Sequence, residues 1–411
     1  MVNDYPQSSG TVGFSRGGIM NWQKIEKILI KIATYVSVAA LASAATFALC
    51  ATNPRISSNT KLEELERVIL SNFIGETDQA TLEDGAAAGM VAATGDMWSF
   101  YIPASEYPSY VATMENTYVG IGVSIKYLED NSGIQITEVS PGSGAEEAGL
   151  LADDIVIGVE GQTIESIGYS EAKKLIRGEA NTQVQLTILR DGETIEVSVT
   201  RRAIEVAVAT GQMLKGQIGL VTIENFDSRC AQETIAQVET LLSQGAKGLI
   251  FDVRNNPGGY RHELVKALDY LLPEGDLFRS VDYRGKETVD TSDANCVQLP
   301  MAVLINGESY SAAEFFAAAL EEYDWAVTVG EPTIGKGYFQ NLVKLSDGSA
   351  VSLSMGKYFT PNGVSLAEVG GLTPNISVEL TEEQSKAVRA GTLPADQDPQ
   401  IQAALEYLLN S

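Results

Sequence analysis

The chain has 411 residues, of which 44% are hydrophobic and 20% charged, a composition typical of a globular protein and not of a disordered one. Its 28 basic and 54 acidic residues give a net charge of −26, which repels phosphate backbones and argues against a nucleic-acid partner. This length allows two to four domains. With a single histidine and no C-x-x-C or H-E-x-x-H spacing, the sequence supports no metal site, and we expect no cofactor.

An uncharged apolar segment of twenty residues runs from Ile32 to Ala51. A helix of about 20 apolar residues crosses a bilayer core, and the basic residues before this segment place the N-terminus in the cytoplasm. We therefore predict a cytoplasmic tail at 1–27, one transmembrane helix at 28–52, and a single-pass protein of the cell membrane whose catalytic part is extracytoplasmic. A cleaved signal peptide is the alternative, because Ala42-Ser43-Ala44 fits a cleavage site.

Apolar residues recur at helical spacing after a short polar linker, over 62–73 and again over 82–94. We predict a helical N-terminal module over residues 58–117. From residue 118 the pattern changes to short alternating segments, with Asp191-Gly192 as a hairpin signal and one helix at 171–176. These segments predict a β-rich domain over 118–202.

The order of pieces over 118–202 resembles a PDZ domain. The resemblance implies that Gly120, Ile121, Gly122 and Val123 form the loop that binds the carboxylate of a substrate's C-terminus. It also implies that the peptide adds as a strand to a sheet edge. A small β-domain that only links its neighbours is the alternative.

Strands and helices alternate in the last region, residues 203–411, with strands expected at 218–223, 248–253 and 301–305 and a helix at 230–244. Such alternation is typical of a layered α/β core.

A serine and a lysine in this region could perform nucleophilic chemistry. Ser311 lies where a helix begins, and the helix N-terminus stabilises a developing oxyanion. Lys336 lies between two glycines and would serve as the base once burial lowers its pKa. If 336–344 is a strand, alternation places Gln340 on the same face as Lys336, where it could hold the amine. The commoner roles are a helix N-cap, which Ser309 could also be, and a solvated turn lysine.

The strand at 248–253 ends in Asn255-Asn256-Pro257-Gly258-Gly259, a turn whose glycines let backbone N–H groups face an oxygen. The N–H of Ala312 is placed to be a second donor. A plain strand-ending turn is the alternative. The segment before Lys336 also resembles a phosphate loop, but Gly337 replaces the hydroxyl residue that binds magnesium, so we reject that reading.

These segments together resemble the carboxy-terminal processing (tail-specific) serine peptidases over residues 62–408. The resemblance implies a PDZ domain beside a crotonase/Clp-like α/β protease core with Ser311 as nucleophile, Lys336 as general base and Gln340 as its partner. It further implies an oxyanion hole of Gly258 or Gly259 with Ala312. Trp98 and Tyr310 stand where the family often has other residues.

The resemblance predicts an endopeptidase that takes protein or peptide substrates with apolar C-termini. It leaves two alternatives: an inactive PDZ scaffold that only binds tails, and a hydrolase using His262, which lacks a G-x-S-x-G motif. Pairing of Cys230 with Cys296 and homo-oligomerisation both stay open.

Overall fold

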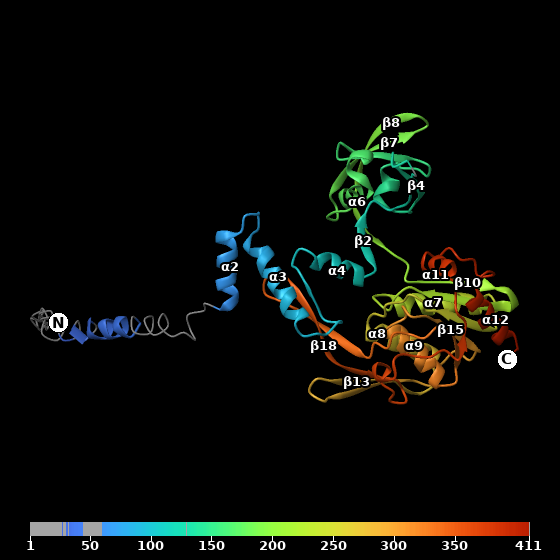
Figure 1. Cartoon of the computed structure of the whole chain (residues 1–411). Coiled ribbons are helices and arrows are strands. Elements are labelled where there is room, and N and C mark those ends of the chain that lie inside the picture. Colours follow the sequence, from blue (N-terminus) through green and yellow to red (C-terminus); the bar gives the residue numbers. More distant parts are fainter. Residues whose placement is uncertain (1–26, 28–29, 32, 44–59, 129, 411) are drawn as a thin grey trace, which may run out of the picture. The chain divides into compact units, whose positions relative to one another are not determined.

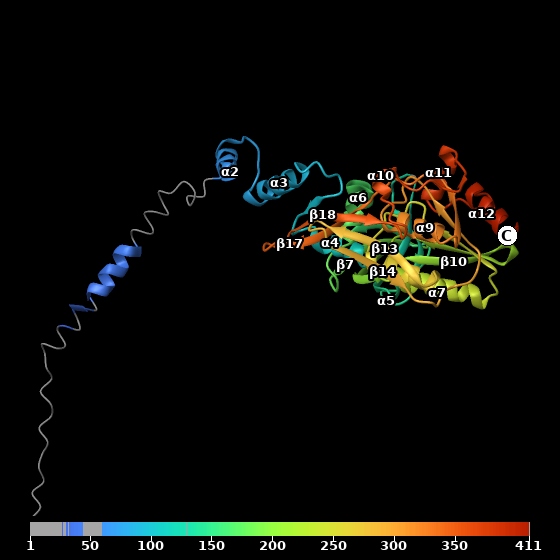
Figure 2. The same cartoon turned by 90° about the horizontal axis from the view of Figure 1, so that it is seen from below.

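The computed structural model describes residues 27, 30–31, 33–43, 60–128 and 130–410. By its internal contacts the chain divides into two compact units, Met1–Ala86 and Ala87–Ser411. Figures 1 and 2 show the elements of both units in two views.

Most of the described residues of the first unit are helical. Helix α2 (Lys61–Asn72) begins with a capping box, in which the Thr60 hydroxyl accepts the Glu63 N–H and the Glu63 carboxylate accepts the Thr60 N–H. Helix α3 (Gln79–Ala92) spans the division between the units. Among the described residues, no helix is both long and apolar enough to cross a bilayer. The predicted anchor at 28–52 lies partly outside the described residues and stays a prediction.

A β-rich domain follows in the second unit. Its sheet has the antiparallel order β3-β4-β5-β7-β8, with β6 paired to β5, so β3 is an edge strand. The elements are β3 (Val123–Tyr127), β4 (Ile134–Val139), α5 (Gly144–Glu147), β5 (Ile155–Val159), β6 (Gln162–Thr163), α6 (Ile164–Ile176), β7 (Gln183–Arg190) and β8 (Glu193–Thr200).

Two local features of this domain bear on the sequence predictions. Asp191 and Gly192 join β7 to β8 with φ of 53° and 84°, the positive values of a type I′ turn, so the predicted hairpin is confirmed. Helix α6 starts seven residues before the expected 171, because Gly168, at φ 73°, joins two helical segments across a kink. Strands β2 (Thr117–Gly120) and β9 (Arg202–Glu205) pair as a ribbon at the ends of the domain.

The largest region is an α/β core built on the sheet β10-β11-β12-β15-β16-β19. All neighbours in it are parallel except β10, which is antiparallel to β11. Strands β12 and β15 are buried at every position, as their continuous apolar sequences predict for parallel strands. The strands are β10 (Ala209–Leu214), β11 (Ile218–Ile223), β12 (Gly248–Asp252), β15 (Met301–Ile305), β16 (Ala326–Gly330) and β19 (Ile376–Ser377).

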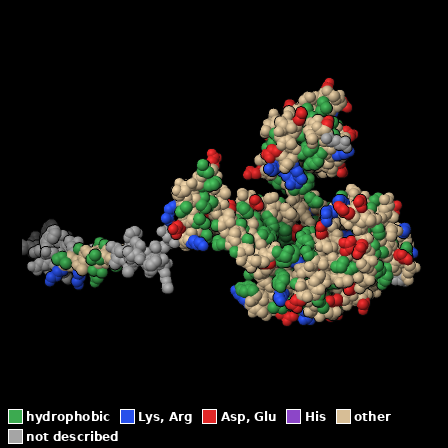
Figure 3. Space-filling model, viewed as in Figure 1, with side chains coloured by type: hydrophobic (Ala, Val, Ile, Leu, Met, Phe, Trp, Pro, Cys, Tyr) green, Lys and Arg blue, Asp and Glu red, His purple; other side chains and the backbone are tan. Residues whose placement is uncertain are grey.

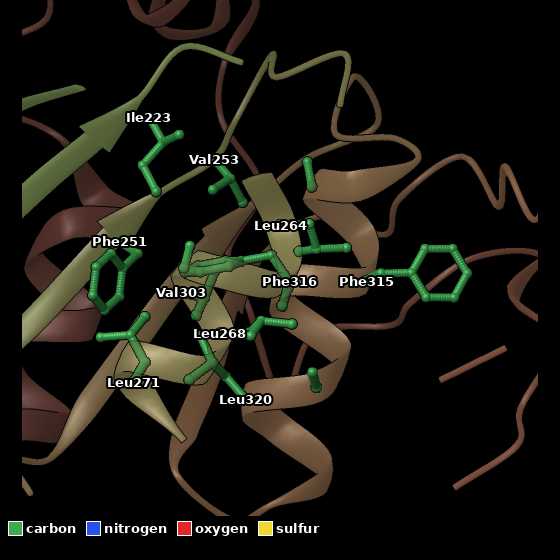
Figure 4. Close-up of a cluster of buried hydrophobic side chains, with 14 of the residues drawn as sticks. Ile223, Phe251, Val253, Leu264, Leu268, Leu271, Val303, Phe315, Phe316 and Leu320 are labelled. Carbon is green, nitrogen blue, oxygen red and sulfur yellow. The ribbon is translucent and has the colours of Figure 1, made fainter. Parts of the chain in front are cut away.

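Helices cover both faces of this sheet. Helices α7, α8 and α9 pack on one face around Phe251 and Phe316, and α12 packs on the other against Ile250 and Leu304. Figure 4 shows the first cluster, in which Phe316 points at the sheet. The helices are α7 (Cys230–Ser243), α8 (Arg261–Leu271), α9 (Ala312–Glu322), α10 (Leu366–Val369), α11 (Glu382–Arg389) and α12 (Pro399–Asn410), with a 3₁₀ turn at Lys215–Gln217.

A second antiparallel sheet belongs to the same region. Its order is β1-β18-β13-β14, and β17 pairs with β18 alone among the described strands. The strands are β1 (Phe100–Ile102), β13 (Gly275–Asp282), β14 (Glu287–Ser292), β17 (Tyr338–Lys344) and β18 (Ala350–Phe359), and helix α4 (Tyr107–Met114) follows β1. Acidic side chains are spread over the face of the molecule seen in Figure 3, in keeping with the net charge of −26.

Candidate active site

Ser311 occupies the N-cap position of α9 in a strained conformation, with φ 58° and ψ −125°. A non-glycine residue with such angles persists only where its surroundings hold it, and strain of this kind gathers at functional sites. The side chain is 8% exposed, and the helix behind it is buried from Ala312 to Leu320. The apolar helix thus anchors the serine at a position where the positive end of the helix dipole meets its oxygen.

Ser309 has a different setting from Ser311. It is fully buried, its hydroxyl donates to the Val253 carbonyl at 2.7 Å, and the same oxygen accepts the Asn306 N–H at 3.0 Å. Because this buried hydroxyl both donates and accepts a hydrogen bond, it joins the turn after β12 to the turn after β15. The structure therefore gives Ser309 a structural role and leaves Ser311 as the serine at the helix start.

The Asn-Asn-Pro-Gly-Gly turn lies directly against Ser311. A β-carbon at Gly258 would lie 2.7 Å from Ser311 Cβ and 2.8 Å from the Ala312 nitrogen, so only glycine fits there. The turn is fixed by Asn256, whose amide donates to the Ile223 carbonyl at 2.7 Å. The two predicted segments are therefore in contact, as the hypothesis of a shared oxyanion site requires.

The hydrogen bonds distinguish the N–H groups of the two glycines. The Gly258 N–H donates to Asn256 Oδ1 at 2.8 Å, and the Gly258 carbonyl accepts the Phe226 N–H at 2.7 Å. Because the peptide bond is trans, the Gly259 N–H points away from Phe226. In the described part of the chain, no acceptor is bonded to the N–H of Gly259 or of Ala312. These two N–H groups are the ones free to meet a substrate oxygen.

A buried carboxylate joins the serine to the lysine. Glu314 is fully buried, and its Oε2 accepts the N–H groups of Ser311 and Lys336, each at 2.9 Å. Its Oε1 accepts the Gly335 N–H at 2.6 Å and the Thr333 hydroxyl at 2.5 Å. Hydrogen bonds to a buried carboxylate are strong, so one side chain holds two segments that lie far apart in sequence in a defined relation.

The side-chain nitrogen of Lys336 lies over two aromatic rings. Its Nζ lies 4.5 Å from the centre of the Trp98 ring and 5.6 Å from that of Tyr310. Burial lowers the pKa of Lys336, and the negative charges of Asp96 and Glu314 partly oppose that shift. Within the described residues, no hydrogen bond joins this Nζ to Ser311 or to Gln340.

The expected pairing of Gln340 with the lysine amine is not what the structure shows. Strand β17 begins at Tyr338, after Lys336, and a bulge between Phe339 and Gln340 breaks the alternation of side chains. The Gln340 amide donates to Ser354 Oγ at 2.9 Å and to the Tyr338 carbonyl at 3.2 Å. The premise that the strand includes Lys336 was therefore wrong, whereas the role of Gln340 as partner of the amine stays a prediction.

The loop from Gly120 to Val123 enters the edge strand β3. The Ile121 side chain is buried, and its carbonyl accepts the Ala145 N–H at 2.8 Å. A β-carbon at Gly122 would lie 2.2 Å from Ser143 Cβ, so this position also requires glycine. Because β3 pairs only with β4 among the described strands, its other edge is open to an added peptide strand.

Sequence reasoning missed two acidic residues near these groups. Burial acts to raise the pKa of Asp96, but hydrogen bonding from Ser354, from the Ser99 hydroxyl at 2.5 Å and from the Trp98 N–H at 3.2 Å keeps that pKa lowered, with a smaller contribution from the charge of Lys336. Asp227 is 7% exposed with no partner at Oδ1, and burial raises its pKa to about 7. Asp96 lies in the segment 95–101, which resembles the family but carried no assigned role, and Asp227 lies in no such motif, so only the fold could reveal their surroundings.

The remaining predicted features are simpler. His262 is exposed at the start of α8, as its sequence position indicated. Cys230 and Cys296 are both free thiols in the structure. In the part of the chain that the structure describes, no group of three or more His, Cys, Asp or Glu residues could hold a metal ion.

Comparison with known proteins identifies both regions. Residues 217–378 match the model of peptidase family S41, and residues 112–189 match that of the PDZ domain. The chain is 33% identical to carboxy-terminal processing protease CtpA of Bacillus subtilis over 78% of its own length and 69% of that protein. It is 30% identical to a probable CtpA-like serine protease of Staphylococcus aureus, over 82% of its own length and 68% of that protein.

A solved structure shares the fold. A putative S41 protease from Bacteroides fragilis matches with a TM-score of 0.50 and 16% identity, covering 84% of this chain and 97% of that one. The family models and the two curated relatives confirm the family resemblance that the sequence motifs indicate. The chain therefore belongs to peptidase family S41, among the PDZ-containing serine peptidases of the carboxy-terminal processing type.

Proposed function

We propose that this peptidase is a membrane-anchored endopeptidase that cleaves exported proteins, with a cytoplasmic tail at 1–27 and an anchor at 28–52. The uncharged segment Ile32–Ala51 and the basic residues before it support the anchor and its orientation. The helical region at 58–117, the PDZ domain at 118–202 and the peptidase core at 203–411 would then lie outside the cytoplasm. Assembly into a homo-oligomer is compatible with this arrangement.

Ser311 is the proposed nucleophile and Lys336 the proposed general base. The neutral Lys336 amine removes the Ser311 proton as the serine oxygen bonds to the substrate carbonyl carbon. The resulting ammonium then gives that proton to the leaving amine as the peptide bond breaks. In deacylation a water molecule gives a proton to the same amine as its oxygen bonds to the acyl carbon, and the ammonium returns that proton to the Ser311 oxygen as the ester bond breaks. Gln340 is the proposed partner of the amine in the active arrangement.

The carbonyl oxygen becomes negatively charged in each tetrahedral intermediate. We assign its stabilisation to the N–H groups of Gly259 and Ala312, with Gly258 holding the loop against the serine. Preorganised backbone donors of this kind contribute about 3 to 4 kcal/mol each to transition-state stabilisation.

The PDZ domain is the proposed receptor for the apolar C-terminus of a substrate. The N–H groups of the loop Gly120-Ile121-Gly122-Val123 would meet the terminal carboxylate, and the open edge of β3 would pair with the peptide backbone. Binding at the tail would present an upstream peptide bond to Ser311.

The observation that carries this proposal is the Glu314 carboxylate, which bonds the backbone at both Ser311 and Lys336. A buried acid that joins these two segments is expected where their relative position matters to chemistry. A protein that only bound tails would not need the strained serine or the desolvated lysine.

The test uses the full chain in detergent with a loosely folded protein that ends in apolar residues. Wild type is compared with Ser311→Ala, Lys336→Ala and His262→Ala. We expect the first two to lower turnover by at least about a thousandfold and the third to leave it unchanged. Turnover that survives Ser311→Ala would disprove the nucleophile, and protection of the N-terminus from protease in sealed vesicles tests the topology.

A further inference from the structure

The amine of Lys336 is held by aromatic rings and not by the groups it would serve. Trp98, at 4.5 Å, precedes β1, and Tyr310, at 5.6 Å, directly precedes Ser311. The two ring centres are 5.8 Å apart, so both rings face the amine from a single aromatic wall.

Such a wall distinguishes the two protonation states of lysine. The face of an aromatic ring carries partial negative charge and attracts an ammonium, whereas it has no comparable attraction for a neutral amine. The wall therefore favours the protonated form, which cannot act as a base. It also holds Nζ out of hydrogen-bonding contact with Ser311 and Gln340 within the described structure.

We propose that Trp98 and Tyr310 are positioning residues that hold Lys336 as an ammonium away from Ser311, and so set the pH at which the peptidase becomes active. The proposal rests on the assignment of Lys336 as the base. Catalysis then requires the lysine to leave the rings, lose its proton and reach the serine. The attraction of the wall for the ammonium opposes the first two of these steps.

Other groups facing Lys336 do not account for a pH response in the neutral to alkaline range. Asp96 has a lowered pKa and stays ionised there, and the Tyr310 phenol has a raised pKa because of burial and stays neutral. Glu314, from α9, bonds the lysine backbone and not its amine. The titrating group in this cluster is therefore the lysine itself.

Leucine is the substitution that isolates the effect of the rings. It keeps the apolar surroundings that lower the pKa of Lys336 but removes the charged face of the ring. We expect the acidic limb of the kcat/KM profile to move about one pH unit lower in Trp98→Leu/Tyr310→Leu. At a pH on that limb, kcat/KM should rise about tenfold. Tyr310→Leu alone should move the limb less, in the same direction.

Two variants serve as controls. Tyr310→Phe keeps the ring face and should keep the limb within about 0.3 pH units. Tyr107→Leu removes a ring that lies 4.6 Å from Lys344 Nζ, a matched lysine–tyrosine pair away from the base, and should not move the limb. A limb that moves to higher pH in the double leucine variant overturns the proposal, as does a limb that stays in place together with an unchanged pKa of Lys336.

A second measurement separates this proposal from the catalytic assignment. The pKa of Lys336 is titrated by NMR with isotope-labelled lysine in full-length Ser311→Ala, with and without the two leucine substitutions. A fall of the lysine pKa with no shift of the kinetic limb supports the wall but disproves Lys336 as the base. An unchanged lysine pKa disproves the wall, whatever the kinetics show.

Discussion

The two halves of the active site are held in different ways. The serine half is buried: Ser311 is 8% exposed, Asn256 and Glu314 are fully buried, and the helix behind them is part of the main apolar cluster. The lysine half lies where the chain enters the second sheet. Among the described strands β17 pairs only with β18, and Gln340 on β17 bonds Ser354. The serine half is thus part of the apolar core, whereas the lysine half adjoins the strand β17.

This difference shows where the activity can be controlled. Moving Ser311 would disturb the packing of α9, whose interior is close-packed and resists displacement. Moving the Lys336 amine involves rotation of a side chain whose Nζ has no hydrogen-bond partner among the described residues, while Glu314 holds its backbone. The nucleophile and its oxyanion donors are therefore preorganised, and the base is the adjustable part of the site.

The largest expected effect comes from removing the side chain that joins the halves. Glu314→Ala leaves three backbone N–H groups and the Thr333 hydroxyl without their acceptor in the interior. We expect the free energy of unfolding to fall by at least about 3 kcal/mol and kcat/KM by at least about a hundredfold. Urea denaturation and peptide turnover measure the two.

The control for that change is Glu308→Ala. Glu308 is an exposed glutamate on the segment that precedes Ser311, and its carboxylate pairs with distant Arg389. The substitution should change stability by less than about 0.5 kcal/mol. If Glu314→Ala kept kcat/KM within tenfold of wild type, the two halves would not depend on this carboxylate.

The next largest effect concerns Asp227, a buried acid in the tightly packed serine half. Asp227 follows Phe226, whose N–H bonds the Gly258 carbonyl, and its folded pKa of about 7 lies above the value of 3.8 expected when unfolded. The folded state therefore retains a proton that the unfolded state loses, and stability falls as the pH rises from about 4 to above 7. We expect Asp227→Asn to stabilise the protein by about 2 to 4 kcal/mol at pH 8 and by little at pH 4.

Denaturation at both pH values measures this difference. Asp191→Asn, in the exposed turn between β7 and β8, carries the same charge change and should shift stability by less than about 0.5 kcal/mol at either pH. A loss of stability in Asp227→Asn at pH 8 would mean that the carboxylate has a favourable partner in the folded protein.

The smallest effect is expected in the lysine half. Gln340→Ala removes a half-buried side chain whose present bonds are to Ser354 and to the backbone of β17. We expect less than about 1 kcal/mol of destabilisation, and a fall in kcat of about tenfold if Gln340 is, as proposed, the partner of the amine during catalysis. A loss as large as that of Lys336→Ala would contradict the view that this half is loosely held.

Several elements were predictable because their causes are local. The apolar segments at 218–223 and 301–305 form β11 and β15 at those bounds, and the helix expected near Ser311 begins at Ala312. Periodicity and turn chemistry depend on residues that are adjacent in sequence. They determine the secondary structure of a segment where it is fully buried. The resemblance to the carboxy-terminal processing serine peptidases is confirmed by the family models over 112–189 and 217–378 and by the curated relative.

Other features escaped because a distant segment decides them. Alternation placed Gln340 beside Lys336, but pairing with β18 starts the strand at Tyr338 and introduces a bulge. Trp98 could not be related to the lysine, because more than two hundred residues separate them in the sequence. Register and contact between such segments follow from tertiary packing, which a local pattern does not contain.

The sequence by itself determined which chemical groups this protein brings to its site: one serine at a helix start, a lysine between glycines and a glycine turn after a buried strand. The tertiary structure alone decided how those groups are held. It bound Ser309 into the interior, joined Ser311 to Lys336 through Glu314, and set the lysine against two rings. The physical reason is that burial and hydrogen-bond partners, which set pKa and position, come from segments brought together only by folding.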